Sequence, residues 1–256
     1  TNMKITSTYA VFFSPTDGSK KSAISIARGL EGELQEIDLT LENNQEYHFD
    51  RHDVVVFGFP VYGGRVVHVG LERLKHIHGD HTPCIISVTY GNRDYDDALL
   101  ELFMEVKKRG FIPVGAAALI GEHTYGQIQV GRPHQTDLNN DELFGSLVQD
   151  KIKNDHFSFV SIPGSYPFRQ GGQAGHFYPE TNEQCIHCGK CVNHCPVHAI
   201  SDDCKTIDEN RCLACFRCLK KCPVHAKNLD HNAKYQEFIV GFNQKLKEPK
   251  NNQYFI

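Results

Sequence analysis

The chain has 256 residues, 40% of them hydrophobic, with 27 Lys and Arg against 31 Asp and Glu and a formal net charge of -4. Nucleic-acid binding depends on clustered basic residues, so this balance argues against a nucleic-acid partner. No apolar stretch approaches the roughly 20 residues of a transmembrane helix, and the N-terminus lacks the features of a signal peptide. We therefore expect a cytoplasmic protein without a membrane span, and the sequence leaves its oligomeric state open.

Residues 1–160 alternate short apolar runs with amphipathic stretches, which is the pattern of a parallel sheet covered by helices. The clearest strand has a continuous β-branched run, as expected for a sheet buried on both faces. The predicted strands are Thr8–Phe13, Leu34–Leu39, Asp53–Phe59, Pro83–Tyr90 and Ile112–Ile120, and the predicted helices are Lys20–Leu30, Asp96–Arg109 and Asp141–Ile152. The pattern predicts an α/β domain with five parallel strands.

Three loops leave the carboxyl ends of these strands, where ligands bind in such sheets. Ser14–Lys21 is small and hydroxylic and runs into a helix, so its amides and hydroxyls can bind a phosphate. The alternative is an ordinary capped helix. Gly58–Arg65 and Tyr90–Asp96 each combine glycine with tyrosine and fit a planar ring, the alternative being half-buried aromatics at strand ends.

Together these loops resemble the phosphate loop and the two ring-binding loops of flavodoxins, over about residues 4–160. The resemblance implies non-covalent FMN and strand order 2-1-3-4-5. It also implies that Tyr62 stacks on the flavin ring. Asp17 stands where the family has glycine, and its carboxylate would repel a phosphate unless it turned outward. The implied FMN-binding residues are Ser14, Thr16, Asp17, Gly18, Ser19, Lys20, Pro60, Val61, Tyr62, Gly63, Gly64, Tyr90, Gly91, Asn92 and Tyr95.

Residues 161–180 are rich in glycine and proline, which indicates an extended connector. Four aromatic residues, Tyr166, Phe168, Phe177 and Tyr178, argue against a flexible tether. We expect the connector to pack across the α/β domain.

The last third of the chain holds two copies of the spacing C-x2-C-x2-C-x3-C-P, which binds 4Fe-4S clusters. The fourth cysteine of each run ligates the other cluster in two-cluster ferredoxins, so the predicted ligand sets are crossed. Zinc is the alternative, although it usually takes separated C-x2-C pairs. The predicted sets are Cys185, Cys188, Cys191 and Cys222 for one cluster, and Cys195, Cys212, Cys215 and Cys218 for the other.

Two cysteines remain outside these sets. Cys84 lies in an apolar strand and is expected to be a buried small hydrophobic residue. Cys204 lies in the polar loop between the two runs, where the sequence assigns it no role.

Residues 181–230 resemble bacterial two-cluster ferredoxins, and both halves together resemble the fused flavodoxin-ferredoxin proteins of anaerobic bacteria, also called ferrodoxins. The wider resemblance includes Phe13–Thr16, Tyr90–Ala98 and Gly131–Pro133. The expected organisation has four parts. They are a flavodoxin-like domain (1–160), the connector (161–180), a small ferredoxin-like α+β domain (181–230), and a C-terminal helix and tail (231–256) that clasps the domains.

The resemblance implies an electron-transfer flavo-iron-sulfur protein that relays electrons between FMN, two 4Fe-4S clusters and external redox protein partners. The alternative is a flavin-dependent reductase that acts on a small substrate at the FMN and is fed by its own ferredoxin domain. No nicotinamide-binding motif is visible, and no catalytic residue is assigned. Four basic residues around the second cysteine run predict a docking surface for a partner: Arg211, Arg217, Lys220 and Lys221.

Two groups of histidines also stand out. His123 leaves the fifth strand on the ligand side of the sheet, where it is either a proton donor to the flavin or a structural loop residue. His76, His78 and His81 form a loose cluster to which the sequence assigns no function.

Overall fold

The computed structural model describes residues 4–154, 157 and 161–256. Its central sheet has five parallel strands in the order β2-β1-β4-β7-β8, as the order 2-1-3-4-5 predicts. The flavodoxin-like α/β fold is therefore confirmed, and ligands in such sheets bind at the carboxyl ends of the strands. The five strands are β1 (Ser7–Phe12), β2 (Glu33–Asp38), β4 (Asp53–Tyr62), β7 (Thr82–Tyr90) and β8 (Phe111–Ile120).

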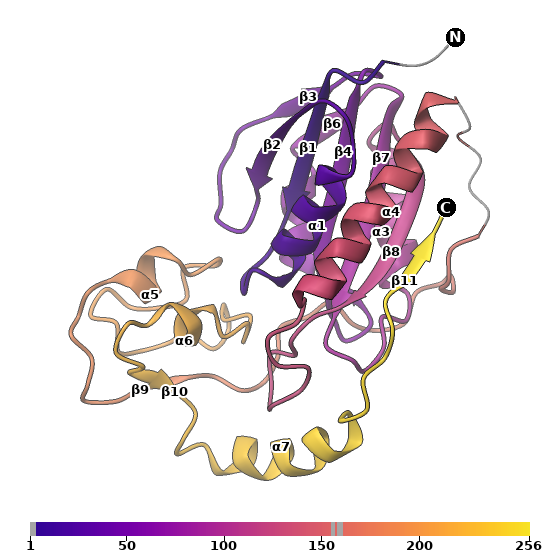
Figure 1. Ribbon diagram of the computed structural model, residues 1–256. Helices are drawn as coiled ribbons and strands as arrows, with labels where there is room; N and C mark the ends of the chain where they lie inside the picture. Colours follow the sequence, from indigo (N-terminus) through magenta and orange to yellow (C-terminus); the bar gives the residue numbers. More distant parts are fainter. Residues whose placement is uncertain (1–3, 155–156, 158–160) are drawn as a thin grey trace.

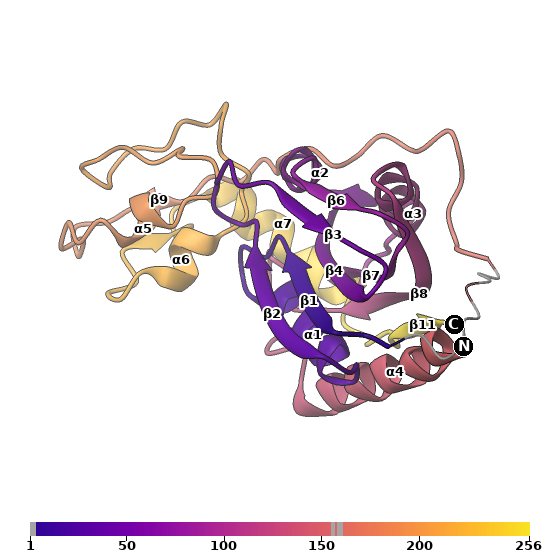
Figure 2. The same ribbon diagram turned by 90° about the horizontal axis from the view of Figure 1, so that it is seen from above.

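Helices cover both faces of the sheet (Figures 1 and 2). Helices α1 (Gly18–Arg28) and α4 (Gln135–Lys153) lie on one face, and α2 (His68–Leu74) and α3 (Ala98–Lys108) lie on the other. Alternate residues of each strand enter opposite cores. In β4, for example, Val54 packs with the α1–α4 layer, and Val55 packs with the layer of α2 and α3. Burial on both faces explains the continuous apolar runs of the sequence.

Helix α4 begins six residues earlier than predicted, at Gln135 rather than Asp141. The first turn is polar and shows no apolar period, but a capping box starts the helix there. The His134 backbone N–H donates to Asp137 Oδ2 at 2.8 Å, which satisfies a group at the helix end.

Several short elements were not predicted, because they are too short to show a period. Strand β5 (Arg65–Val66) pairs antiparallel with β4. Strands β3 (Tyr47–Phe49) and β6 (Ile77–Gly79) form a separate parallel ribbon.

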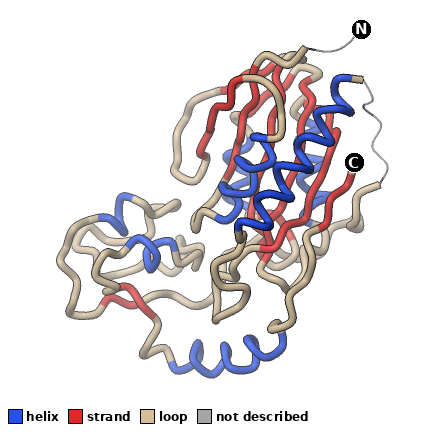
Figure 3. The backbone as a smooth tube through the Cα atoms, viewed as in Figure 1, coloured by secondary structure: helices blue, strands red, loops and turns tan. Residues whose placement is uncertain are grey.

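The ferredoxin-like region lies beside the carboxyl ends of the sheet (Figure 1) and consists mostly of loops (Figure 3). Its regular elements are α5 (Lys190–Asn193), α6 (Arg217–Lys221), and the antiparallel pair β9 (Glu180–Thr181) and β10 (Lys227–Asn228). Within the described part of the chain, no helix combines the length and apolar character that crossing a membrane requires.

The connector packs along the α/β domain, as expected. Asp97 accepts hydrogen bonds from the backbone N–H groups of Ser165 (2.8 Å) and Arg169 (2.7 Å). Further along, the Gly172 N–H donates to the Tyr62 carbonyl at 2.7 Å. These bonds fix the connector to the strand ends.

The C-terminal segment clasps the two regions, and its last strand was not predicted. Helix α7 (Ala233–Lys245) joins an aromatic cluster with Tyr125 of the α/β domain, Phe177 of the connector and Phe216 of the ferredoxin-like region. Strand β11 (Gln253–Phe255) then adds antiparallel to β8, at the sheet edge. The segment therefore ties both regions to one sheet.

Strand β11 brings Tyr254 to a buried carboxyl group. The Tyr254 hydroxyl donates to Asp141 Oδ1 at 2.7 Å, and burial raises the pKa of Asp141 to about 7. An unfolded aspartate ionises near pH 3.9, so between these values folding takes up a proton at Asp141. Stability from this group is therefore present at low pH and is lost as pH rises towards 7.

Asp141→Asn removes this dependence. Between pH 5 and 7, the stability of the variant relative to the parent should rise by up to about 1.4 kcal/mol per pH unit, as the parent must bury a group that prefers to ionise. Urea unfolding across this pH range measures the difference. Asp150→Asn, on the exposed side of the same helix, is the matched control. Parallel pH profiles for parent and Asp141→Asn would contradict the prediction.

Candidate functional site

A cavity of about 860 Å³ opens at the carboxyl ends of β1, β4, β7 and β8. Its size lies within the range of small-molecule and cofactor sites. The three loops predicted from the sequence meet here. The predicted residues that line the cavity are Ser14, Thr16, Asp17, Gly18, Ser19, Pro60, Val61, Tyr62, Gly63, Tyr90 and Gly91.

The loop between β1 and α1 has the geometry of an anion site. Ser14 Oγ accepts the Lys20 N–H at 3.0 Å, and the Ser14 N–H donates to Thr40 Oγ1 at 2.8 Å, which fixes the turn. The N–H groups of Gly18 and Ser19 belong to the first turn of α1, where no earlier helical carbonyl can accept them. They and the positive end of the helix favour an anion in the cavity.

Lys20 does not reach this cavity. Its Nζ lies 3.3 Å from Glu36 Oε2 and over the ring of Phe12. The neighbouring Lys21 lines the cavity instead. Adjacent helical residues point in different directions, so Lys21 and not Lys20 faces the cavity.

Three residues of the predicted ring loops also lie outside the cavity. Asn92 is buried and donates to the carbonyls of Leu246 and Glu248, both at 2.8 Å, so it anchors the C-terminal segment. The Tyr95 hydroxyl donates to Gln253 of β11 at 2.5 Å. Gly64 is packed against Asp96 and has a φ of +85°, which favours glycine.

The cavity continues along surfaces that sequence reasoning missed. Thr89 is the penultimate residue of β7, and its buried Oγ1 has no hydrogen-bond partner among the described residues. Buried hydroxyl groups normally have a hydrogen-bond partner, so this one is available to a polar ligand atom. Its position at a predicted strand end was the available signal. The other missed lining residues include Glu122, Thr124, Tyr125, Arg132, Arg169, Gln170, Gly171, Gly172, Gln173, Ala174, Gly175, His176 and Ala214.

His123 lines the cavity as a neutral imidazole. Burial lowers the pKa of His123 to about 4. Its Nδ1 accepts a hydrogen bond from the Tyr125 backbone N–H at 2.8 Å. The proton of the neutral ring therefore lies on Nε2. A Cβ on Gly91 would come within 2.2 Å of this ring, so glycine there permits the close packing of His123. At neutral pH the ring can donate a hydrogen bond but holds no extra proton.

The eight motif cysteines fall into two groups in space. One small cavity is lined by Cys185, Cys188, Cys191 and Cys222, and another by Cys195, Cys212, Cys215 and Cys218. The structure thus brings together the same two sets that the spacing predicts, each with one member from the other run. None of the eight forms a disulfide bond in the described structure.

The chemistry of these groups fits thiolate ligands. Backbone N–H groups point to the sulfur atoms of Cys195, Cys212 and Cys222 from Ala199, Ala214 and Ala226, at 3.2 to 3.3 Å. Such bonds stabilise the charged sulfur of an iron-sulfur site and tune its potential. Each cavity therefore has the donor set for one cluster.

The two cysteines outside the predicted ligand sets are both buried, one as expected and one not. Cys84 is fully buried in β7, as expected. Cys204, to which the sequence assigned no role, is only 2% exposed and lines the first cysteine cavity. The polar sequence of the loop gave no sign of this burial.

The second cysteine cavity shares a wall with the large cavity. Ala214 lines both, and the neighbouring Leu213 carbonyl accepts the Gly175 N–H of the connector at 3.2 Å. Burial raises the pKa of Tyr62 well above its usual value, and the nearby thiol of Cys215 adds to the shift. Tyr62 therefore lies close to the second cysteine set.

Helix α6 holds the ferredoxin-like region against the phosphate loop. Arg217 is 7% exposed, and its Nη1 donates to the carbonyls of Ser14 (3.2 Å) and Pro15 (2.8 Å). Lys220 pairs with Glu122 at 2.6 Å. Burial alone would raise the pKa of Glu122, but the Lys220 and Gly131 hydrogen bonds bring it below its usual value.

These contacts correct the predicted docking surface. Arg217, Lys220 and Lys221 face the α/β domain, and of the four predicted residues Arg211 alone shows no such contact in the described structure. A basic residue in the sequence can contact another part of its own chain as well as an external partner, and its charge does not distinguish the two. The basic cluster joins two parts of one chain.

Comparisons with known proteins match parts of the chain. A 4Fe-4S binding domain model matches residues 180–201, which include the first cysteine run. No curated protein matches the chain.

Among solved structures, an archaeal flavodoxin is 13% identical and aligns over 57% of this chain and 99% of its own, with a TM-score of 0.39. Flavodoxin 1 from Bacillus cereus is 16% identical over 57% of this chain and 98% of its own, with a TM-score of 0.40. The strand order itself identifies the flavodoxin-like fold. The family match adds a 4Fe-4S binding segment at residues 180–201 to this fold.

Arg217→Met should loosen the phosphate loop. The variant leaves the buried Ser14 and Pro15 carbonyls without their donor, at a cost of about 1–3 kcal/mol. Amide exchange of residues 14–20, followed by mass spectrometry, should become faster than in the parent. Arg211→Met is the control and should leave this exchange unchanged. Equal protection of the loop in Arg217→Met and the parent would show that the contact does not hold it.

Proposed function

We propose that the chain relays electrons between one FMN in the large cavity, two 4Fe-4S clusters in the cysteine cavities, and an external redox protein. A flavin exchanges one or two electrons and each cluster one, so the combination suits conversion between two-electron and one-electron steps. The single observation that supports this most strongly is the shared wall at Ala214, because it places a flavin-sized cavity directly beside four cysteines.

The residues of the large cavity fit FMN at both ends. The first turn of α1 offers N–H groups and hydroxyls for the phosphate, with Lys21 as the nearby cation. Tyr62 and Tyr90 offer aromatic faces for the ring. The unpartnered hydroxyl of Thr89 offers a hydrogen bond between these ends. Asp17 is compatible with the phosphate because its carboxylate lies 3.3 Å from Lys221 Nζ.

The positions of the two cysteine sets support an order of electron transfer between the cofactors. The second set adjoins the flavin cavity, and the first set includes the exposed Cys188. We therefore assign the second cluster to exchange with FMN and the first to exchange with an external partner.

Arg217 would also set the potential of the second cluster. It lines the cavity of the second cysteine set, and its buried Nε has no partner among the described residues. A cation beside a cluster stabilises the more negative reduced form and so raises its reduction potential. A higher reduction potential of the second cluster favours electron transfer to it from the adjacent flavin.

A flavin-dependent reductase is the second candidate. The cavity extends past the ring loops to Arg132, Arg169 and His176, which offer polar and charged groups to a small substrate. His123 could orient such a substrate through Nε2–H. The two candidates differ in what reduces or oxidises the flavin directly.

The crossed ligand sets give one test. Cys222→Ser should perturb the same cluster as Cys188→Ser, since both line the first cavity although they belong to different runs. Electron paramagnetic resonance of the anaerobically reduced protein resolves the two clusters. Cys218→Ser is the control and should alter the other signal. A Cys222→Ser spectrum that matches Cys218→Ser would overturn the crossed assignment.

The relay is tested by anaerobic stopped-flow on the intact protein, isolated with its cofactors. FMN and both clusters should be reduced rapidly by a reduced low-potential ferredoxin, and NADH and NADPH should reduce neither on that time scale. Visible absorbance follows both cofactor types.

Rapid direct reduction by a nicotinamide would refute the carrier function and favour the reductase. Isolation of the folded protein with FAD, or without affinity for FMN, would refute the flavin assignment itself.

A further inference from the structure

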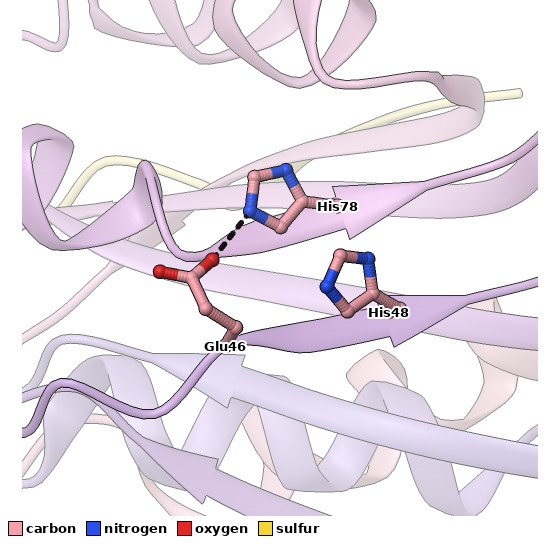
Figure 4. Close-up of side chains that lie close together, drawn as sticks. All are labelled: Glu46, His48 and His78. Carbon is pink, nitrogen blue, oxygen red and sulfur yellow. Dashed lines mark hydrogen bonds and ion pairs between the residues drawn. The ribbon is translucent and has the colours of Figure 1, made fainter.

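Three side chains that the redox function does not use converge on the β3–β6 ribbon (Figure 4). His48 and His78 are partners in the parallel register, and their rings stack with centroids 4.9 Å apart and planes 16° apart. Glu46 directly precedes β3, and its Oε2 lies 2.6 Å from His78 Nε2. One ligand atom from each residue lies within 4.8 Å of the others.

We propose that Glu46, His48 and His78 form a binding site for one divalent transition-metal ion of the Zn²⁺ class. Two imidazoles and a carboxylate are a donor set that zinc takes, with water completing the coordination. Zinc bonds to nitrogen and oxygen are about 2.0–2.2 Å long, so tetrahedral ligand atoms stand about 3.3 Å apart. The present separations, 2.6 Å between Glu46 Oε2 and His78 Nε2 and at most 4.8 Å among the three atoms, bracket this value.

The surroundings of the site prepare the carboxylate for this role. His76 Nδ1 is hydrogen-bonded to Glu46 Oε1, the oxygen that does not face His78. This second contact orients the carboxylate, as outer hydrogen bonds do for metal ligands. Glu46 and His48 are exposed and His78 is half-buried, so an ion and its water have access.

The position of the site indicates a structural effect. Strand β3 leads into β4 and β6 leads into β7, so the ribbon lies at the amino ends of the parallel strands, opposite to the cavity. A metal would link residues 46 and 48 to residue 78. It would thereby cross-link the segment that leads into β4 and the segment that leads into β7. A ligand that binds only the folded state raises its stability.

The test uses the intact protein with its clusters in place, because empty cysteine sites would also bind zinc. Anaerobic dialysis against buffered Zn²⁺, followed by elemental analysis, gives the zinc content, and thermal unfolding gives the stability. His48→Gln and His78→Gln remove one ligand each. His81→Gln is the matched control, since His81 lies in the same region with its side chain 84% exposed and pairs with Asp80.

The parent and His81→Gln should bind one equivalent of zinc that raises the unfolding temperature. His48→Gln and His78→Gln should bind it at least ~10-fold more weakly and lose that rise. His48 lies on the surface, so His48→Gln decides the matter even where His78→Gln folds poorly. Equal zinc content and equal stabilisation in His48→Gln and His81→Gln would overturn the proposal, and so would a parent that binds no zinc.

Discussion

The buried guanidinium of Arg217 fixes how the two cofactor-binding regions meet. Burial of a cation is unfavourable unless hydrogen bonds compensate for it, and here the carbonyls of Ser14 and Pro15 accept two hydrogen bonds from Nη1. Cys215 and Cys218 flank Arg217 in sequence, so the same contact positions the second cysteine cavity. The loop between β1 and α1 and the second cysteine run are therefore held together by one side chain.

Ion pairs and an aromatic cluster add to the contact between the two regions. The pairs Lys220–Glu122 and Lys221–Asp17 are partly exposed, and such pairs contribute little energy each. The aromatic cluster around Tyr125 supplies the apolar burial, because it joins the α/β domain, the connector and helix α7. The contact between the two regions therefore combines a buried cation, two partly exposed ion pairs and an apolar aromatic cluster.

The sequence predicted the features that have a local cause. Strands buried on both faces show as continuous apolar runs, and the cysteine sets follow from fixed spacing. Contacts between distant segments leave no such pattern. Arg217 and Ser14 are 203 residues apart, and a cation in the run Arg217–Lys221 resembles any surface charge. Strand β11 was missed for the same reason, since its three residues pair with β8 across more than 130 positions.

Asp17 stands where the flavodoxin pattern has glycine, and a contact with a distant residue offsets its charge. Its φ of 69° lies in the left-handed region, which explains why glycine suits this position and why aspartate is among the few residues that tolerate it. Its carboxylate would oppose an anion at the start of α1, but Lys221 lies 3.3 Å away and compensates the charge. That lysine belongs to the ferredoxin-like region. The charge of Asp17 beside the first turn of α1 is therefore compensated from the other region of the chain.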